Sequence, residues 1–304
     1  MSSPFISVVI PHLEQEEYLR SCLESLVRQT YDMRRVEIIV VDNGSNELPK
    51  GICSAYDGVR LVEEPTPGPG PARNLGVKLS SGDILAFIDA DCTADPGWLA
   101  AVDAALAQSG VAVVGGDVRI ARRDPGHATM LEAYESIYAY RQEEYINVQK
   151  FSGTGNLAMR RETYDAVGPF CGIERAEDRD WGHRAARLGY AIAYVPEMIV
   201  HHPARRSFEE LHGKWDRHIS HDFAEYATRQ LGGLRWALYG FAVAMSPVFE
   251  IVRLCNCDRV TGLSERCLAF AAVTRIRAWR ARRMFRLLFT AGSPVSIGSW
   301  TRRS

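Results

Sequence analysis

In the first third of the chain, short apolar runs alternate with segments whose apolar residues recur at helical spacing. The runs are rich in β-branched residues, as buried strands are, and they comprise residues 5–11, 36–41, 59–63 and 84–88. The helical segments comprise residues 16–29, 71–79 and 95–107. Strands that alternate with helices pair in parallel through crossover connections, so the pattern predicts an α/β sheet.

The alternation continues less regularly through the middle of the chain. Further strands are predicted at residues 111–120, 153–160 and 192–195, with a helix at residues 180–188. Residues 129–149 are predicted to form a helix or a long covering segment. After about Ser207 the pattern is helical only. We therefore predict an α/β domain, residues 1–207, followed by a helical C-terminal extension, residues 208–304.

One segment of the extension, residues 236–249, is almost wholly apolar. It is about fourteen residues long and is interrupted by Pro247, whereas a helix that crosses a bilayer needs about twenty residues. We expect a buried or interfacial helix there.

Composition is that of a globular protein. Hydrophobic residues make up 46% of the 304 and charged residues 24%, which suffices for a sizeable core and argues against disorder. No secretory pattern precedes the apolar stretch that begins at Phe5, and the seven cysteines are an odd number at scattered positions. We expect reduced thiols in a cytoplasmic protein.

Charge is distributed unevenly, although the net charge is only −1. Nine of the 36 basic residues lie from Arg266 to the end, where there is no Asp or Glu, so the other 27 face all 37 acidic residues. Arginines alternate with aromatic and aliphatic residues over 275–289, which predicts an interfacial helix on an anionic membrane surface. The alternative is a solvated basic helix packed on the acidic body or in an oligomer interface. No nucleic-acid-binding module is present, so nucleic acid is not an expected partner.

Two carboxylates, Asp89 and Asp91, directly follow the predicted strand 84–88. Ligands of α/β sheets bind where strands end, and paired carboxylates in a loop can hold Mg²⁺ or Mn²⁺. Such a cation bridges phosphate oxygens and offsets the charge of a departing diphosphate. The alternative is that both residues only form a turn.

Three more residues lie near the predicted strand ends or helix starts. Asp42 ends the second strand and can accept hydrogen bonds from a base or a ribose hydroxyl, or it can cap its own turn. Pro11 would shape the neighbouring base pocket. Arg73 lies near the start of a helix, where a guanidinium and free backbone N–H groups suit a diphosphate; the alternative is a surface arginine.

Taken together, several segments resemble glycosyltransferase family 2 of the GT-A fold, in the family's order. They are residues 5–11 (FISVVIP), 36–45 (VEIIVVDNGS), 70–76 (GPARNLG), 87–92 (FIDADC), 151–161 (FSGTGNLAMRR), 177–184 (EDRDWGHR) and 201–202 (HH). The resemblance covers about residues 5–205. The chain departs from the family at His12-Leu13-Glu14 and in a proline-rich loop before Ala72.

The resemblance implies a mixed, mostly parallel sheet flanked by helices and an inverting glycosyl transfer. The donor would be a nucleoside-diphosphate sugar, with a UDP-sugar favoured, and the acceptor a hydroxyl, possibly on a lipid-linked glycan. Cell-surface polysaccharide or glycolipid synthesis is the expected setting, at the inner face of the cell membrane. The cofactor would be Mn²⁺ or Mg²⁺, held by Asp91 and Asp89.

The acidic pair Glu177-Asp178 supplies the candidate general base. Displacement at the anomeric carbon needs a carboxylate that takes the proton of the acceptor hydroxyl. Spacing alone cannot choose between the two neighbours, and the resemblance favours Asp178, with Glu177 in support. The alternative is an acid-rich helix N-terminus.

The remaining candidates follow from their positions in the resembling segments. His202, rather than His201, would complete the metal ligands, although a packed histidine is as good a reading. Gly153 and Gly155 would let the donor approach the backbone closely. Trp181 would stack on an acceptor sugar, or belong to the core.

Two other functions were weighed. A nucleotidyltransferase on a similar sheet would need a glycine-rich loop with lysine near the first strand, and the sequence has none there. A non-catalytic protein that binds nucleotide sugars is disfavoured because Asp91 and Asp178 are both intact.

Overall fold

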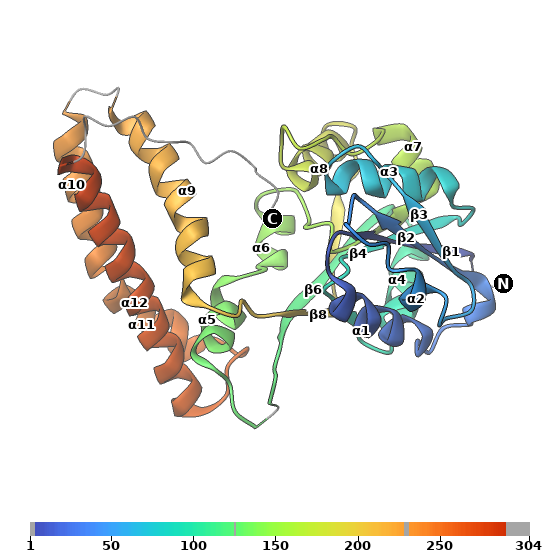
Figure 1. Cartoon of the computed structure of the whole chain (residues 1–304), viewed down its shortest axis with the longest axis horizontal. Helices are drawn as coiled ribbons and strands as arrows, with labels where there is room; N and C mark the ends of the chain where they lie inside the picture. Colours follow the sequence, from blue (N-terminus) through green and yellow to red (C-terminus); the bar gives the residue numbers. More distant parts are fainter. Residues whose placement is uncertain (1–3, 125, 228–230, 290–304) are drawn as a thin grey trace. The chain divides into compact units, whose positions relative to one another are not determined.

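The computed structural model describes residues 4–124, 126–227 and 231–289, which form two compact units (Figure 1). The first comprises Met1–Arg119 and Tyr140–Pro203, and the second comprises Ile120–Ala139 and Ala204–Ser304. The second unit thus takes in a segment that we placed in the N-terminal domain. The domain division at residue 207 stays a prediction.

An eight-stranded mixed sheet runs through the first unit, in the order β3-β2-β1-β4-β7-β6-β8-β5. The strands are β1 (Ile6–His12), β2 (Val36–Asp42), β3 (Val59–Glu63), β4 (Ile84–Ile88), β5 (Thr93–Ala94), β6 (Val113–Ala121), β7 (Asn156–Arg160) and β8 (Ile192–Pro203). β1 pairs in parallel with β2 and β4, and β2 in parallel with β3. β7 is antiparallel to β4 and β6.

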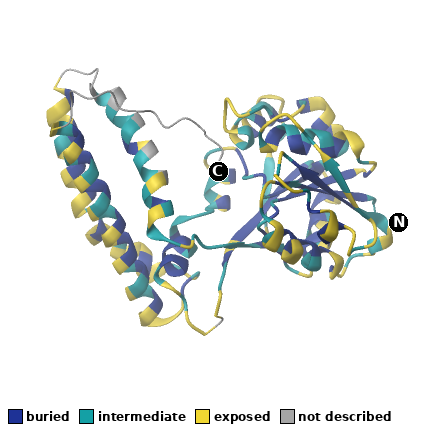
Figure 2. Ribbon diagram, viewed as in Figure 1, coloured by how far each residue is buried: buried dark blue, intermediate teal, exposed yellow. Residues whose placement is uncertain are grey.

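Helices cover both faces of this sheet. They are α1 (Glu16–Val27), α2 (Lys50–Cys53), α3 (Pro69–Leu79), α4 (Trp98–Leu106), α6 (Gln142–Asn147), α7 (Arg161–Val167) and α8 (Glu177–Arg187), with a short 3₁₀ helix at Met33–Arg35. Successive residues of β1 pack into different cores: Val8 lies with α1 and α4, and Val9 with α3 and α8. Burial on both faces explains why the strands are continuous apolar runs (Figure 2).

The helix predicted at residues 129–149 is two helices. α5 (Met130–Tyr138) begins with a capping box, in which Thr129 and Glu132 each satisfy the other's backbone N–H. Tyr140 then adopts a φ of 47°, and the chain enters α6 after it. A left-handed residue ends helical geometry, a break that apolar spacing does not reveal.

The second unit is helical, as predicted for the C-terminal part. Besides α5 it contains α9 (Phe208–Ala227), α10 (Gly232–Met245), α11 (Pro247–Asn256) and α12 (Gly262–Phe289). The apolar segment 236–249 therefore spans two helices that meet at Ser246-Pro247. Within the described residues, no single helix has the length and apolar composition of a membrane span, whereas α10 and α11, bent by 41°, reach both only as a pair.

Candidate functional site

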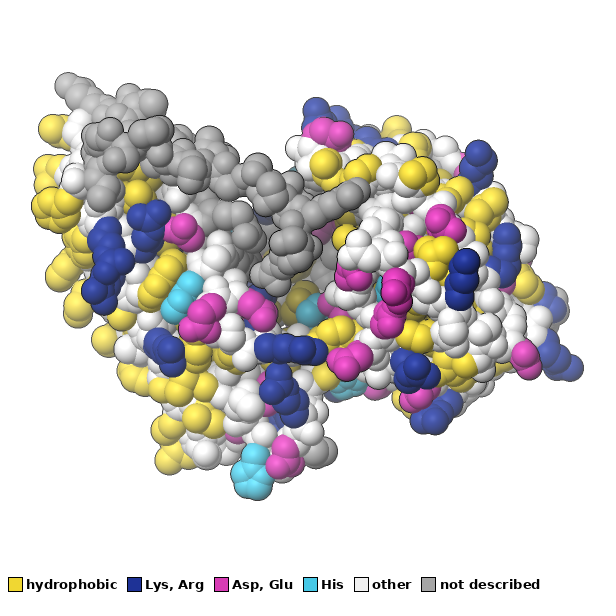
Figure 3. All heavy atoms as spheres, in the orientation of Figure 1, with side chains coloured by type: hydrophobic (Ala, Val, Ile, Leu, Met, Phe, Trp, Pro, Cys, Tyr) yellow, Lys and Arg dark blue, Asp and Glu magenta, His cyan; other side chains and the backbone are white. Residues whose placement is uncertain are grey.

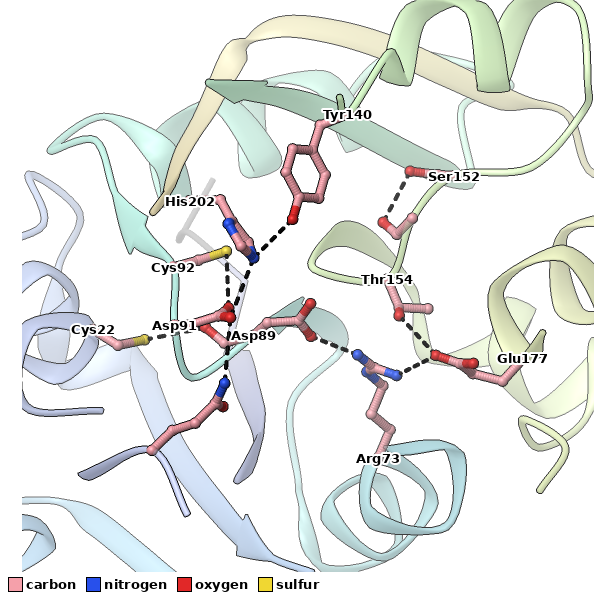
Figure 4. Close-up of polar contacts among 12 residues, drawn as sticks. Cys22, Arg73, Asp89, Asp91, Cys92, Tyr140, Ser152, Thr154, Glu177 and His202 are labelled. Carbon is pink, nitrogen blue, oxygen red and sulfur yellow. Dashed lines mark hydrogen bonds and ion pairs between the residues drawn. The ribbon is translucent and has the colours of Figure 1, made fainter. Parts of the chain in front are cut away.

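The carboxyl ends of parallel strands bring the predicted site residues together (Figure 4). Asp89 and Asp91 follow β4, which pairs with β1. β1 in turn pairs with β2, which ends at Asp42. The apolar strands thus fix the backbone, and the first polar side chains after them converge at one edge of the sheet.

Asp91 faces His202 across this edge. The Nε2 atom of His202 lies 3.2 Å from Oδ2 of Asp91, and the hydroxyl of Tyr140 lies 2.9 Å from the same nitrogen. The other ring nitrogen, Nδ1, lies 2.7 Å from the carbonyl of Pro203. Because a carbonyl only accepts, Nδ1 carries the hydrogen, and Nε2 of the neutral ring presents its lone pair toward Asp91.

The choice between the two histidines follows from the pleat of β8. Neighbouring residues of a strand point to opposite faces. Nε2 of His201 lies 2.8 Å from Oδ1 of Asp95, so this ring belongs to a separate pair. His202 is the histidine that reaches the D-x-D motif, Asp89-Ala90-Asp91, through its contact with Asp91.

The carboxylates of the motif have opposite pKa shifts. Burial raises the pKa of Asp89, and Arg73 only partly opposes it. Burial also favours a higher pKa for Asp91, but the hydrogen bond and charge of His202 outweigh it, so the pKa of Asp91 is lowered. The pKa of His202 is raised, because contact with Asp91 outweighs burial. The site therefore favours a positive charge between Asp91 and His202.

These donor atoms suit a hard divalent cation that a substrate helps to hold. Within the part of the chain that the structure describes, no three His, Cys, Asp or Glu side chains are grouped closely enough to hold a metal by themselves. Mg²⁺ sites on phosphate substrates commonly use one or two carboxylates and complete the shell with phosphate oxygens and water. Asp91 and His202 fit that pattern, with Asp89 beside them.

Arg73 lies between two carboxylates rather than facing outward. Its Nη2 atom lies 2.6 Å from Oδ1 of Asp89, and its Nη1 atom lies 2.9 Å from Oε1 of Glu177. Its side chain is 3% exposed. The surface-arginine alternative does not hold, because Arg73 forms a buried bridge between the D-x-D segment and the start of α8. Its contact with a diphosphate stays a prediction.

Glu177 and Asp178 are adjacent but differently engaged. Glu177 is tied to Arg73 and also accepts a 3.4 Å hydrogen bond from Thr154. The carboxylate of Asp178 accepts a 2.7 Å hydrogen bond from the backbone N–H of Arg179. Burial raises the pKa of Asp178, although that hydrogen bond opposes the shift. Of the two, Asp178 is the carboxylate without a charged side chain bound to it.

The carboxylate of Asp42 accepts hydrogen bonds from its own turn and from His12. Its Oδ1 atom accepts from Nδ1 of His12 at 2.9 Å and from the hydroxyl of Ser45 at 2.6 Å. Its Oδ2 atom accepts from the backbone N–H groups of Gly44 and Ser45. A carboxylate has about four lone-pair positions, and all are used in a side chain that is 2% exposed. These contacts fit the turn-capping alternative, and contact with a base or a ribose hydroxyl stays a prediction.

The two glycines and Pro11 differ in what the structure says of them. A Cβ atom on Gly155 would lie 2.5 Å from Oδ2 of Asp89, so this glycine makes room for the carboxylate of the motif. Gly153 donates its N–H to Oε1 of Gln142 at 3.0 Å. Pro11 lies in β1. For Gly153 and Pro11, contact with the donor stays a prediction.

Trp181 is a core residue, and the predicted acceptor contact is corrected. Its side chain is 1% exposed, and its Nε1 atom donates to the carbonyl of Gly168 at 3.0 Å. Its ring lies 5.7 Å from that of Phe170, centroid to centroid. A sugar has no access to a tryptophan buried in this way.

Sequence reasoning missed several residues that hold the site. Asn156, fully buried, accepts from Nε1 of Trp98 and donates to the carbonyls of Asp117 and Met198, which ties α4 to β6 and β8. Gln15 donates to Oδ2 of Asp91 at 3.3 Å. An asparagine in a strand and a glutamine before a helix carry no sequence signal for these roles.

Two buried thiols also line the motif. Cys22 contacts the carbonyl of Asp89, and Cys92 contacts Oδ1 of Asp91, each at 3.8 Å. Burial raises the pKa of both thiols, and the nearby carboxylates raise it further. Both thiols are therefore protonated at neutral pH in the metal-free protein and pack against the motif.

Comparison with known proteins agrees with this geometry. The family model described as "Glycosyl transferase family 2" matches residues 7–176. Glycosyltransferase AglE of Haloferax volcanii is 36% identical over 208 residues, which is 66% of this chain and 68% of AglE. The putative glycosyltransferase EpsH of Bacillus subtilis is 27% identical over 216 residues, covering 66% of this chain and 61% of EpsH.

Solved structures resemble the fold over most of the chain. Mannosyltransferase PcManGT from Pyrobaculum calidifontis, described in complex with GDP-Man and Mn²⁺, has a TM-score of 0.58 at 17% identity and covers 96% of this chain and 89% of its own. S. aureus TarS has a TM-score of 0.51 at 16% identity and covers 90% of each. Such likenesses confirm the predicted GT-A fold.

Proposed function

The chain belongs to glycosyltransferase family 2, and on that premise we propose that it transfers a sugar from a nucleoside-diphosphate donor to a hydroxyl acceptor, with inversion at the anomeric carbon. The observation that supports this most is the chain of contacts Asp91–His202, Asp89–Arg73 and Arg73–Glu177. It links acidic groups that would hold a divalent cation for the leaving diphosphate with acidic groups suited to deprotonating the acceptor.

Asp91 and His202, with Asp89 beside them, would hold the cofactor, Mn²⁺ or Mg²⁺. When bound, the cation supplies the positive charge that offsets the developing charge on the diphosphate. PcManGT, which shares the fold, is described with GDP-Man and Mn²⁺, and GalNAc-T7 is described with UDP, GalNAc and Mn²⁺.

Asp178 would act as the general base. As the acceptor oxygen forms its bond to the anomeric carbon, the bond from that carbon to the diphosphate breaks, and the hydroxyl proton passes to the Asp178 carboxylate. Glu177 is a positioning residue in this proposal, because its pairing with Arg73 holds the start of α8 against the D-x-D segment.

The donor and acceptor follow from the resemblance. We expect a UDP-sugar donor, with a GDP-sugar as the rival that PcManGT suggests. We expect a hydroxyl acceptor on a lipid-linked glycan, in the synthesis of a cell-surface polysaccharide or glycolipid. The enzyme would work on the cytoplasmic side of the membrane.

A thermal-shift screen of UDP, GDP, CDP and dTDP, each with and without Mn²⁺, tests the proposal. A ligand that binds only the folded state at a hundredfold excess over its dissociation constant stabilises it by about 2.7 kcal/mol. We expect a rise in Tm for one nucleotide, dependent on Mn²⁺ and absent in the Asp91→Ala variant. No shift with any nucleotide would contradict the proposed donor site.

A further inference from the structure

Helices α10 and α11 expose an unusually apolar surface to solvent. Ten of the eighteen large hydrophobic side chains that are exposed in the described chain fall between residues 231 and 252. We call this surface the outer face; its main members are Leu234, Leu238, Phe241, Met245, Phe249 and Val252. Their exposed fractions run from 48% at Met245 to 80% at Phe249. A concentration of this kind marks an interaction surface rather than scattered exposure.

The outer face is not the side by which α10 packs in its own unit. Trp236, Gly240 and Val243 form the buried stripe of α10. The Nε1 atom of Trp236 donates to the carbonyl of Met284 in α12 at 2.9 Å. A helix that is apolar all round while one side is already packed needs a second apolar environment for the other.

Charge along the same stretch is basic. Glu250 is the one acidic residue between Leu231 and Cys257 in the sequence. Its side chain is only 15% exposed, and it pairs with Arg277 at 3.3 Å and with Arg253 at 3.5 Å. The exposed charges of α10 and α11 are therefore those of Arg235 and Arg253. Figure 3 shows hydrophobic side chains along this edge of the helical unit, with basic side chains beside them.

Helix α12, where sequence analysis placed the membrane contact, packs its apolar side inward. Ile276, Met284 and Leu287 are buried in the helical unit. The ring of Trp279 stacks on His212, with centroids 4.2 Å apart. These apolar residues of α12 thus pack inside the helical unit, and contact of residues 275–289 with a membrane stays a prediction.

We propose that the outer face of α10 and α11 seats the protein on an anionic phospholipid bilayer. The apolar side chains enter the boundary between headgroups and acyl chains, and Arg235 and Arg253 stay at headgroup level. The occupant is a bilayer because the surface joins a broad apolar face with basic charge and buries its one acid. An anionic lipid bilayer interacts favourably with both the apolar side chains and the basic charge.

The helices lie on the bilayer rather than cross it. α12 runs alongside both, because Trp236 of α10 contacts Met284 and Glu250 of α11 contacts Arg277. A crossing by α10 and α11 would carry the arginines of α12 into the hydrocarbon, where each costs roughly 2.5–3.5 kcal/mol on insertion scales. When α10 and α11 lie at the bilayer interface, the arginines of α12 stay in water.

Flotation of the full chain with phosphatidylcholine vesicles, with and without phosphatidylglycerol, tests the proposal. We expect binding to both, stronger with phosphatidylglycerol, and reversible transfer to a second vesicle population. The double variant Phe241→Ser/Phe249→Ser should lower the partition coefficient at least about tenfold. The control Val148→Ser/Leu188→Ser, two equally exposed apolar residues of the first unit, should not. Each variant should keep the wild-type Tm, which excludes misfolding as the cause.

Three results would overturn the proposal. One is wild-type protein that stays unbound with both vesicles. Another is a dimer in solution that the double variant abolishes, since a second copy would then cover the outer face. The third is bound protein that does not transfer between vesicles, because a helix pair that spans the bilayer cannot exchange. None depends on glycosyl transfer, so the catalytic proposal is judged separately.

Discussion

Nε2 of His202 and Oδ2 of Asp91 lie 3.2 Å apart, and while the ring is neutral both atoms are acceptors, because Nδ1 donates to the carbonyl of Pro203. Two lone pairs that face each other repel unless a proton or a cation lies between them. The raised pKa of His202 and the lowered pKa of Asp91 show that a proton between these two atoms is favoured. A bound divalent cation would remove the repulsion in the same way.

His202→Ala should therefore weaken Mn²⁺-dependent nucleotide binding. Loss of a group that holds or orients a metal typically costs about 10- to 100-fold in affinity. Calorimetric titration of the nucleotide at fixed Mn²⁺ measures it. His201→Ala is the matched control, because His201 pairs with Asp95 instead. Equal losses in both variants would show that neither ring is a ligand.

Asp178→Asn should lower transfer by about 10²–10⁴-fold and leave donor binding nearly intact. The amide keeps the shape of the side chain but cannot take the acceptor proton, and a general base contributes about 10²–10⁴-fold. Steady-state kcat and the nucleotide Kd together measure this. Asp165→Asn, at an exposed acid of α7, is the control. Near-normal kcat in Asp178→Asn would assign the proton transfer to another group.

The pH dependence of kcat/KM should show the raised pKa of Asp178. A general base works when ionised, so kcat/KM rises as pH increases through its pKa. Burial places that pKa above the ordinary aspartate value, which is about 3.9, so the acid limb should lie above it. Measurement of kcat/KM against pH at saturating Mn²⁺ would show this acid limb, and the residual activity of Asp178→Asn should lack it. An acid limb at the ordinary aspartate pKa would contradict the assignment of Asp178 as the general base.

Gly155→Ala should displace the carboxylate of Asp89. The added Cβ would meet Oδ2 at 2.5 Å, and overpacking of this kind costs about 1–3 kcal/mol. Nucleotide affinity and Tm should both fall. Gly97→Ala is the control, because its Cβ would meet no atom within 4 Å. A variant at Gly155 with unchanged affinity would mean that Asp89 is not needed where it lies.

The sheet could be predicted because its strands are buried on both faces. Such strands are continuous apolar runs, and the predicted run at residues 59–63 coincides with β3. The D-x-D residues could be placed because they directly follow a run of this kind. Chain order and spacing were enough for these features.

Partners of polar side chains could not be predicted from spacing. Nothing near Arg73 in the sequence indicates that its guanidinium pairs with Asp89 and with Glu177, the latter more than a hundred residues away. Asp42 gained a partner, His12, from the register of β1 on β2. Long-range contacts decide such roles, and in a single sequence they have no local signature.

The site holds more acidic than basic groups: Asp89 and Glu177 share the guanidinium of Arg73, Asp91 has His202 beside it, and Asp178 adds a fourth carboxylate next to Glu177. A bare diphosphate that diffuses toward so many carboxylates is repelled, whereas a nucleotide already complexed with a divalent cation is not. Binding would then be ordered, with the cation arriving first or together with the donor. In a cell short of free Mn²⁺ or Mg²⁺, added sugar nucleotide would no longer raise the rate.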